Sequence, residues 1–255
     1  MQTPIIMIHG AFCAGWAFER FRAPFESAGH MVTAPDLPGH DAGGGRSVAG
    51  LSTKDYAAAV VRLVEIQAAP PLLIGHSLGG LIAQMAATRA RIAGLILLAP
   101  SAPWGVTGST AEEAISAVSL YALGPYWALA VDPDYPAARN YLFNRLDKAE
   151  RRQTFARLTP ESGRALWETL NWWLDPFATT LVNPMRVQAP VLAIAGGKDA
   201  IHPPATVRST ALRIGGETVV FDDMSHWLVG EPGWEAVADT CLQWIGRISG
   251  SNGAA

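Results

Sequence analysis

The nine residues Leu72-Leu73-Ile74-Gly75-His76-Ser77-Leu78-Gly79-Gly80 decide the fold. An apolar run typical of a buried strand leads directly into the pattern G-x-S-x-G and then into a helical pattern, which is the setting in which this motif presents a nucleophilic serine. So sharp a turn leaves no room for β-carbons two residues before and after the serine, and Gly75 and Gly79 supply that room. The turn would raise Ser77 above the carboxyl edge of a sheet, at a helix N-terminus that favours developing negative charge. We therefore predict that Ser77 is a nucleophile; the alternative is a tight turn with an incidental serine.

Short, uniformly apolar runs recur along the chain and indicate strands that are buried on both faces of a parallel sheet. They are Ile5–Ile8, Met31–Ala34, Leu72–Ile74, Leu95–Leu98, Val191–Ala195 and Thr218–Phe221. Patterns of helical spacing lie between most of them, at Thr53–Ile66, Leu78–Ala90 and Trp234–Ile248. Strands that alternate with helices predict an α/β fold, with a doubly wound, mainly parallel sheet of about six strands flanked by helices.

The alternation fails from about residue 100 to about residue 184, where helical fragments and many aromatic residues occur but no convincing strand. One strand run ends just before this stretch and the next begins just after it. We therefore expect a helical cap, residues 101–184, inserted between two late strands. Residues 1–100 and 185–249 would form the core domain, and the small, polar residues 250–255 a disordered tail.

The composition narrows the classes of function. The 255 residues are 49% hydrophobic and 16% charged, with a net charge of −3, which excludes a disordered chain. No basic run could follow a phosphate backbone, so nucleic-acid binding is excluded as well. No unbroken apolar stretch reaches the roughly 20 residues that a membrane-spanning helix needs. Cys13 and Cys241 lie far apart and no signal peptide is visible, so we expect a soluble, cytoplasmic protein of undetermined oligomeric state.

A serine hydroxyl needs a general base, and the base needs an orienting acid. In folds with this serine turn, the acid and then the histidine follow the serine along the chain, which selects His226 as the base. The other histidines precede this position or lie too close to the predicted acid: His9, His30, His40, His76 and His202. The predicted acid is Asp199, which follows the strand run at Val191–Ala195 and would hold one imidazole nitrogen. Asp222 and Asp223 are rivals, although they lie in what reads as a solvated turn.

The loop after the first strand run, His9-Gly10-Ala11-Phe12, is the predicted partner of the serine turn. The backbone N–H groups of Ala11 and Leu78 would form an oxyanion hole, and Phe12 would face the substrate pocket. Further aromatic residues are expected to line that pocket, as neighbours of the base or as the underside of the cap: Trp227, Trp127, Trp172 and Trp173. The histidines and carboxylates lack the spacing of metal ligands, so we expect no metal and no cofactor.

Several motifs together give the chain its family resemblance. They are His9-Gly10-Ala11, Asp36-Leu37-Pro38-Gly39-His40, the serine turn, Gly196-x-x-Asp199-x-x-x-Pro203 and Ser225-His226. The chain resembles the α/β-hydrolase family over essentially its whole length, and its first forty residues resemble the branch of plant methylesterases and hydroxynitrile lyases. This resemblance implies a serine hydrolase with a helical cap, in which Ala11 donates to the oxyanion.

Two departures from that branch bear on the reaction. The lyases carry threonine where this chain has Gly10, and lysine where it has Trp227, so cyanohydrin cleavage is not expected. Relatives with an aspartate nucleophile, the epoxide hydrolases and dehalogenases, are excluded by Ser77.

The expected function is hydrolysis of a carboxylic ester, with a neutral, apolar acyl or aryl group, through an acyl-enzyme on a Ser-His-Asp triad. The only partner expected is therefore a small-molecule ester. Two alternatives stay open. One is cleavage of a carbon–carbon bond, an amide or a lactone by the same triad, and the other is a small-molecule receptor that lacks turnover.

Overall fold

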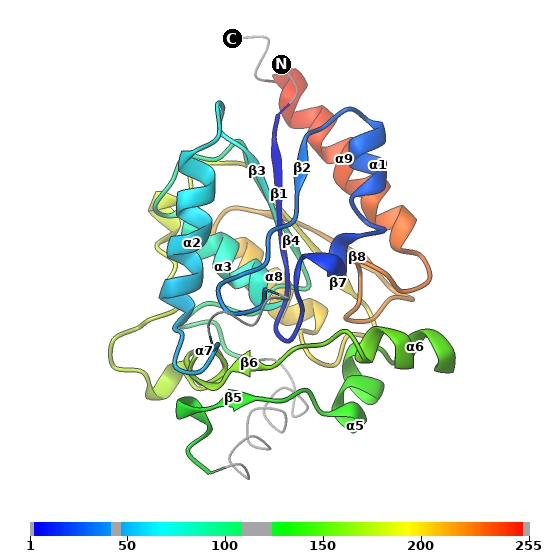
Figure 1. The fold of residues 1–255 in the computed structure, drawn as a ribbon. Helices are drawn as coiled ribbons and strands as arrows, with labels where there is room; N and C mark the ends of the chain where they lie inside the picture. The colour runs from blue at the N-terminus through cyan, green and yellow to red at the C-terminus, as the bar shows by residue number, and fades with distance from the viewer. Residues whose placement is uncertain (1–2, 42–46, 109–123, 252–255) are drawn as a thin grey trace.

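The computed structural model describes residues 3–41, 47–108 and 124–251. At its centre lies a six-stranded sheet in the order β2-β1-β3-β4-β7-β8, in which every pair of neighbours is parallel (Figure 1). The strands are β1 (Ile5–Ile8), β2 (Val32–Thr33), β3 (Leu72–His76), β4 (Gly94–Leu98), β7 (Val191–Gly196) and β8 (Glu217–Phe221). The predicted fold class is therefore confirmed.

Two helical layers bury the faces of this sheet, which explains why the strands are apolar without alternation. Helices α1 (Ala23–Ser27) and α9 (Trp234–Ser251) cover one face, and α2 (Thr53–Glu65), α3 (Leu78–Ala87) and α8 (Pro204–Arg213) cover the other (Figure 1). Successive residues of a strand point to opposite layers. In β1, for example, Ile5 and Met7 join the cluster with α1 and α9, whereas Ile6 and Ile8 join the cluster with α2, α3 and α8.

The segment between β4 and β7 contributes a separate set of short elements. We call residues 101–184 the insert. Its described elements are η3 (Tyr126–Ala128), β5 (Ala130–Val131), α5 (Tyr135–Ala137), η4 (Ala138–Leu142), α6 (Lys148–Phe155), β6 (Glu161–Ser162), α7 (Gly163–Leu170) and η5 (Trp172–Leu174). Two further short helices are η1 (Gly15–Phe18), which follows β1 in the core, and η6 (Pro184–Arg186), which begins at the end of the insert. Figure 1 shows α5, α6, α7, β5 and β6 gathered at the edge of the main sheet where its strands end.

The insert is not wholly helical, which differs from the sequence expectation. Strands β5 and β6 pair antiparallel, with Ala130 opposite Ser162 and Val131 opposite Glu161. Two residues per strand are too few to give an alternating pattern, because typical strands are about five or six residues long. The pairing therefore left no signal in the sequence.

The insert is fastened to the core at the start of α2. Ser52 caps this helix through a reciprocal pair of hydrogen bonds with Asp55. The buried carboxylate of Glu168, from α7, accepts hydrogen bonds from the hydroxyls of Ser52 and Thr53, at 2.8 and 2.7 Å. Because the first turn of a helix carries partial positive charge and free N–H groups, this helix end is a favourable dock for a carboxylate of the insert.

The C-terminal helix is longer than expected. Helix α9 ends at Ser251, so residues 250 and 251 are helical rather than part of a disordered tail, and residues 252–255 lie outside the described part. Gly250 is a poor helix former, but the preceding turns of α9 pack on the sheet, so the helix continues through this residue. Among the described residues, no helix combines the length and the apolarity that crossing a membrane requires.

Candidate active site

Ser77 occupies the sharp turn between β3 and α3. Its backbone has φ 53° and ψ −123°, in the region that residues with a β-carbon avoid. The glycines on either side are sterically required, since a β-carbon at Gly75 would lie 2.4 Å from the carbonyl oxygen of Gly79, and one at Gly79 would lie 2.2 Å from that of Ile8. Backbone bonds from Ser77 N–H to Leu98 and from Ser101 N–H to Ser77 brace the turn, both at 3.0 Å. The strained turn therefore presents a part-exposed serine side chain at the end of the sheet.

Asp199 and His226 form a buried pair beside this turn. His226 Nδ1 lies 2.8 Å from Asp199 Oδ2, and both side chains are almost fully buried. The second carboxylate oxygen accepts the backbone N–H groups of Ile201 and His202, at 2.8 and 2.9 Å. Burial alone would raise the pKa of Asp199, but the charge and hydrogen bond of His226 outweigh it and hold this pKa below its usual range. An ionised carboxylate in this position fixes the imidazole with Nδ1 protonated, which leaves Nε2 as the basic nitrogen.

The serine and the base are linked through His76 rather than by a direct hydrogen bond. Among the described residues, Ser77 Oγ makes no hydrogen bond to the His226 ring. Instead, His76 Nε2–H donates to the backbone carbonyl of His226 at 2.9 Å, and the two rings lie 5.0 Å apart, centroid to centroid. Burial, followed by the nearby His226, lowers the pKa of His76 to about 3. The neutral His76, which directly precedes the serine in the chain, is therefore hydrogen-bonded to the backbone of the base. Catalytic hydrogen bonds are often loose without substrate.

The loop after β1 lies directly against the serine. A β-carbon at Gly10 would lie 3.0 Å from Ser77 Cβ, so a larger residue here would make the loop or the serine shift by a few tenths of an ångström. The next residue, Ala11, and the first residue of α3, Leu78, have backbone N–H groups that donate to no partner among the described residues. Both N–H groups are therefore available as hydrogen-bond donors, and the oxyanion hole stays a prediction. Phe12 follows in the left-handed region, with φ 63°.

The loop that carries His226 is held by a second carboxylate that the sequence did not single out. Glu231 is fully buried and accepts hydrogen bonds from both the backbone N–H and the hydroxyl of Ser225, the residue before the base. Burial raises the pKa of Glu231. The spacing between Glu231 and His226 matches no sequence motif, so only the structure identifies Glu231 as a residue that supports the loop of the base.

Two other histidines are buried in the same region and are neutral. His202 Nε2 lies 3.0 Å from Ser101 Oγ, with its ring 5.2 Å from that of His226. His9 Nε2 accepts the N–H of Leu37 at 2.9 Å. Burial is the main cause that lowers the pKa of each to about 4. Neither forms a hydrogen bond with the side chain of Ser77 among the described residues.

The rival residues are placed away from the imidazole. Asp223 is exposed and forms an ion pair with Lys198 at 2.7 Å, and Asp222 is exposed in the same turn. Cys13 is buried, and burial raises the pKa of its thiol. A buried thiol of high pKa is a poor nucleophile.

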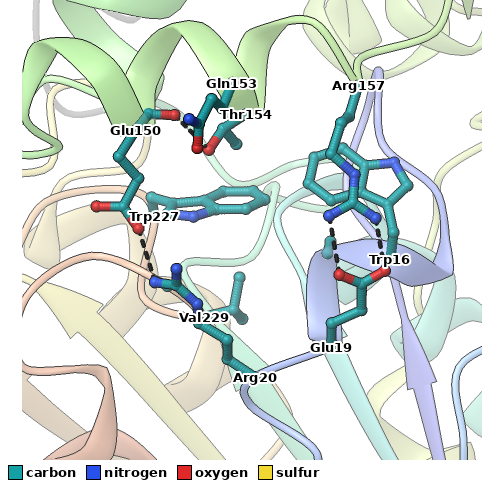
Figure 2. A pocket seen from close by; sticks show the side chains of 11 residues that line it. Trp16, Glu19, Arg20, Glu150, Gln153, Thr154, Arg157, Trp227 and Val229 are labelled. Carbon is teal, nitrogen blue, oxygen red and sulfur yellow. Dashed lines mark hydrogen bonds and ion pairs between the residues drawn. The ribbon is translucent and has the colours of Figure 1, made fainter.

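Trp227, next to the base, separates the buried histidines from a hollow of about 190 Å³. Its indole contacts the rings of His76 and Phe143, at centroid distances of 5.5 and 5.0 Å, and it is 4% exposed. Figure 2 shows that two ion pairs between α6 or its following turn and the core flank this tryptophan. They join Arg20 to Glu150 at 2.6 Å and Arg157 to Glu19 at 2.8 Å. Ser77 does not line this hollow.

The tryptophans expected on the underside of the insert are mostly turned outward. Trp127 and Trp173 are 44% and 57% exposed, and the ring of Trp172 packs edge-to-face against that of Trp104. Ala11 and Phe12 of the loop after β1 instead pack against a cluster of insert residues, Tyr126, Val131 and Leu166. Val131 and Leu166 were not singled out in the sequence. Apolar residues in short fragments carry no signal that separates an inner from an outer face. The lining of the substrate pocket by the three predicted tryptophans stays a prediction.

Comparisons with known proteins identify the family of the chain. The sequence model of the alpha/beta hydrolase family matches residues 5–240, and the chain belongs to that family. A pyrethroid hydrolase of Sphingobium wenxiniae is 35% identical over 112 residues, which are 42% of this chain and 40% of that protein. Salicylic acid-binding protein 2 of Nicotiana tabacum is 38% identical over 81 residues, 30% of each chain. These matches thus span less than half the length of either relative.

A solved structure extends the similarity in fold to nearly the whole chain. A methylesterase from Arabidopsis superposes with a TM-score of 0.72, covering 96% of this chain and 99% of that one, at 16% sequence identity. At this level of identity the comparison establishes the shared fold.

Proposed function

We propose that the protein is a carboxylic-ester hydrolase that works through an acyl-enzyme on Ser77. The observation that carries the proposal is the buried hydrogen bond between His226 Nδ1 and Asp199 Oδ2, next to a serine held in a strained turn. The family and the pyrethroid hydrolase among its relatives support a hydrolytic reaction. The assignment of roles below rests on the positions of this chain's own residues.

In the proposed reaction Ser77 Oγ attacks the ester carbonyl carbon while His226 Nε2 takes the hydroxyl proton. The carbonyl π electrons move onto the oxygen, and the N–H groups of Ala11 and Leu78 stabilise the resulting anion. The tetrahedral adduct collapses, the bond to the alcohol oxygen breaks, and His226 returns the proton to that oxygen. A water molecule then repeats the sequence on the acyl-enzyme, which releases the acid and restores the serine.

The proposed substrates are neutral esters with apolar acyl or aryl groups. Apolar and aromatic side chains of the insert pack with Ala11 and Phe12 of the proposed oxyanion loop, among them Tyr126 and Leu166. The nearby carboxylates Asp199, Glu161 and Glu231 are already engaged by hydrogen bonds. A charged substrate would therefore lose its hydration without gaining a partner.

We propose that the insert acts as a cap over this site, with residues 1–100 and 185–249 as the core. Its elements lie at the carboxyl edge of the sheet (Figure 1), and ion pairs such as Arg157 with Glu19 tie it to the core.

A second candidate function is small-molecule binding with little turnover, which the likeness to a salicylic acid-binding protein favours. The two candidates differ in whether product accumulates beyond one equivalent of protein. A binding protein would be acylated at most once, whereas a hydrolase regenerates its serine.

The test is a panel of p-nitrophenyl esters, an anilide and a β-diketone, assayed with the wild type and with Ser77→Ala. We expect multiple turnovers on the esters, fastest with neutral apolar acyl groups, and loss of several orders of magnitude in Ser77→Ala. Ser101→Ala is the matched control, because it removes a serine hydroxyl that lies 3.0 Å from the ring of His202 and outside the serine turn; it should retain activity. Ester turnover that survives in Ser77→Ala would refute the assignment, and faster turnover of the anilide or the diketone would change the substrate class.

A further inference from the structure

Glu161, the first residue of β6, is a buried carboxylate that joins the insert to three parts of the core. Its side chain has no exposure to solvent. One oxygen, Oε1, accepts the hydroxyl of Tyr56 and the backbone N–H of Ser162, both at 2.7 Å. The other, Oε2, lies 3.2 Å from His40 Nε2 and accepts the backbone N–H of Phe12 at 3.3 Å. Both oxygens therefore have two partners each.

Glu161 is ionised in this environment. Burial by itself would raise its pKa, but the hydrogen bond and charge of His40, with the bonds from Tyr56 and Ser162, hold the pKa of Glu161 below its usual range. The same pair raises the pKa of His40, although burial acts against this. Ion pairs in an interior often contribute little to stability, because desolvation offsets the attraction. The presence of a charged carboxylate at this buried position therefore needs an explanation other than stability.

The contact with Phe12 supplies that reason. The peptide N–H of Phe12 faces the Glu161 carboxylate, and its carbonyl accepts the N–H of Thr159 at 2.9 Å. The insert therefore holds both polar groups of a residue whose φ of 63° is unfavourable without support. Phe12 directly follows Ala11, whose own N–H has no partner among the described residues. Fixing the peptide after Ala11 fixes the direction in which the loop presents the Ala11 N–H.

We propose that Glu161 is a positioning residue for the oxyanion hole, and that the hole is complete only while the insert is seated on the core. This inference rests on the proposed function, in which Ala11 N–H stabilises the oxyanion. Glu161 touches neither the substrate nor the reacting atoms; it acts through the Phe12 peptide. Its loss should therefore affect the charged transition state more than the uncharged ground state.

Glu161→Gln tests this role with almost no change of shape. An amide has one acceptor oxygen, so glutamine cannot serve both sides: if the oxygen faces Tyr56 and Ser162, the NH₂ group opposes the Phe12 N–H. A displaced hydrogen-bond donor costs about 10- to 100-fold in rate. We expect kcat on a p-nitrophenyl ester to fall by that factor, with KM changed by less than about twofold.

A second readout distinguishes positioning from general destabilisation. A trifluoromethyl ketone forms a charged tetrahedral adduct with the serine, whereas the matching amide stays planar. In Glu161→Gln the inhibition constant of the ketone should rise in parallel with the fall in kcat, while that of the amide should stay within about twofold. Tyr56→Phe is the matched control: it removes a donor from the other carboxylate oxygen and leaves the Phe12 contact, so kcat should stay within about threefold of the wild type.

The outcomes separate this inference from the proposed function. If the folded Glu161→Gln enzyme keeps wild-type kcat and ketone affinity, the positioning role is wrong, while the dependence of turnover on Ser77 still supports the hydrolase. If wild-type turnover does not depend on Ser77, the proposed function itself fails. Should Glu161→Gln not fold by circular dichroism, Glu161→Asp keeps the charge but draws the carboxylate one methylene back from the Phe12 N–H. It should produce the same split between kcat and KM, and wild-type kcat in that variant would overturn the inference.

Discussion

The buried histidines at the carboxyl edge of the sheet make the stability of the protein sensitive to mild acid. His9, His76 and His202 have pKa values of about 4, 3 and 4 in the folded state, against about 6.5 for an unfolded chain. Because the folded pKa is the lower one, their contribution is fully present above pH 6.5 and is lost as the pH falls below it, when only the unfolded state binds the protons. Between pH 7.5 and pH 5.5 each histidine removes about 1.3 kcal/mol from the free energy of unfolding, or about 4 kcal/mol for all three.

A single substitution isolates one of these contributions. Two other groups oppose this loss of stability, because their pKa values are raised in the folded state. Glu161 raises the pKa of His40, although burial opposes this, and burial raises the pKa of Glu231. The comparison is therefore made between variants that keep both residues. In His202→Gln, the drop in unfolding free energy from pH 7.5 to pH 5.5 should be smaller than in the wild type by about 1.3 kcal/mol.

The assay is urea unfolding at both pH values, followed by tryptophan fluorescence and far-ultraviolet circular dichroism. Ser101→Ala is the control, since it removes the partner of His202 but keeps the titrating ring. This variant should lose stability at both pH values and keep the wild-type pH dependence. A His202→Gln protein whose pH dependence equals that of the wild type would refute the reasoning that buried, neutral imidazoles cause the acid sensitivity.

Three further changes have definite expected results. Asp199→Asn should lower kcat for ester hydrolysis by roughly 10⁴-fold with little change in KM, because the imidazole loses its tautomer; steady-state kinetics with less than a tenfold effect would contradict this. Ser52→Ala removes the cap of α2 and should cost about 1 to 2 kcal/mol in urea unfolding, and a loss below half of that would speak against the cap. Gly163→Ala places a β-carbon 1.8 Å from the carbonyl oxygen of Tyr126 and should destabilise by about 1 to 3 kcal/mol. Gly246→Ala in α9, where nothing lies within 4 Å, serves as its control and should not destabilise, because alanine is the better helix former.

The central sheet could be predicted because each of its strands leaves the same signal in a short run of sequence. Runs such as Leu72–Ile74 and Val191–Ala195 are apolar at every position, as burial on both faces demands. The serine turn is equally readable, since the backbone at Ser77 excludes β-carbons at Gly75 and Gly79. Asp199 and His226 could be selected by their order along the chain, and the structure brings them into contact.

The rest of the site depends on contacts between distant segments, which no periodic pattern records. Glu161 and Phe12 are 149 positions apart, and Glu231 matches no motif although it supports the loop of the base. The exposure of the Trp127 and Trp173 side chains depends on how the short elements of the insert pack against one another. Their composition is the same whichever face is buried, so the sequence could not distinguish a pocket lining from an exposed surface.

The central claim is that Ser77 forms a covalent acyl intermediate. Acid quenching of the reaction with a p-nitrophenyl ester within the first turnover, followed by peptide mass spectrometry, measures this directly. The account predicts the added mass of one acyl group on the peptide that contains Ser77, in step with a burst of about one equivalent of p-nitrophenol, and neither of them in Ser77→Ala. Rapid turnover with no acylated peptide, or an acyl group on another residue, would contradict it.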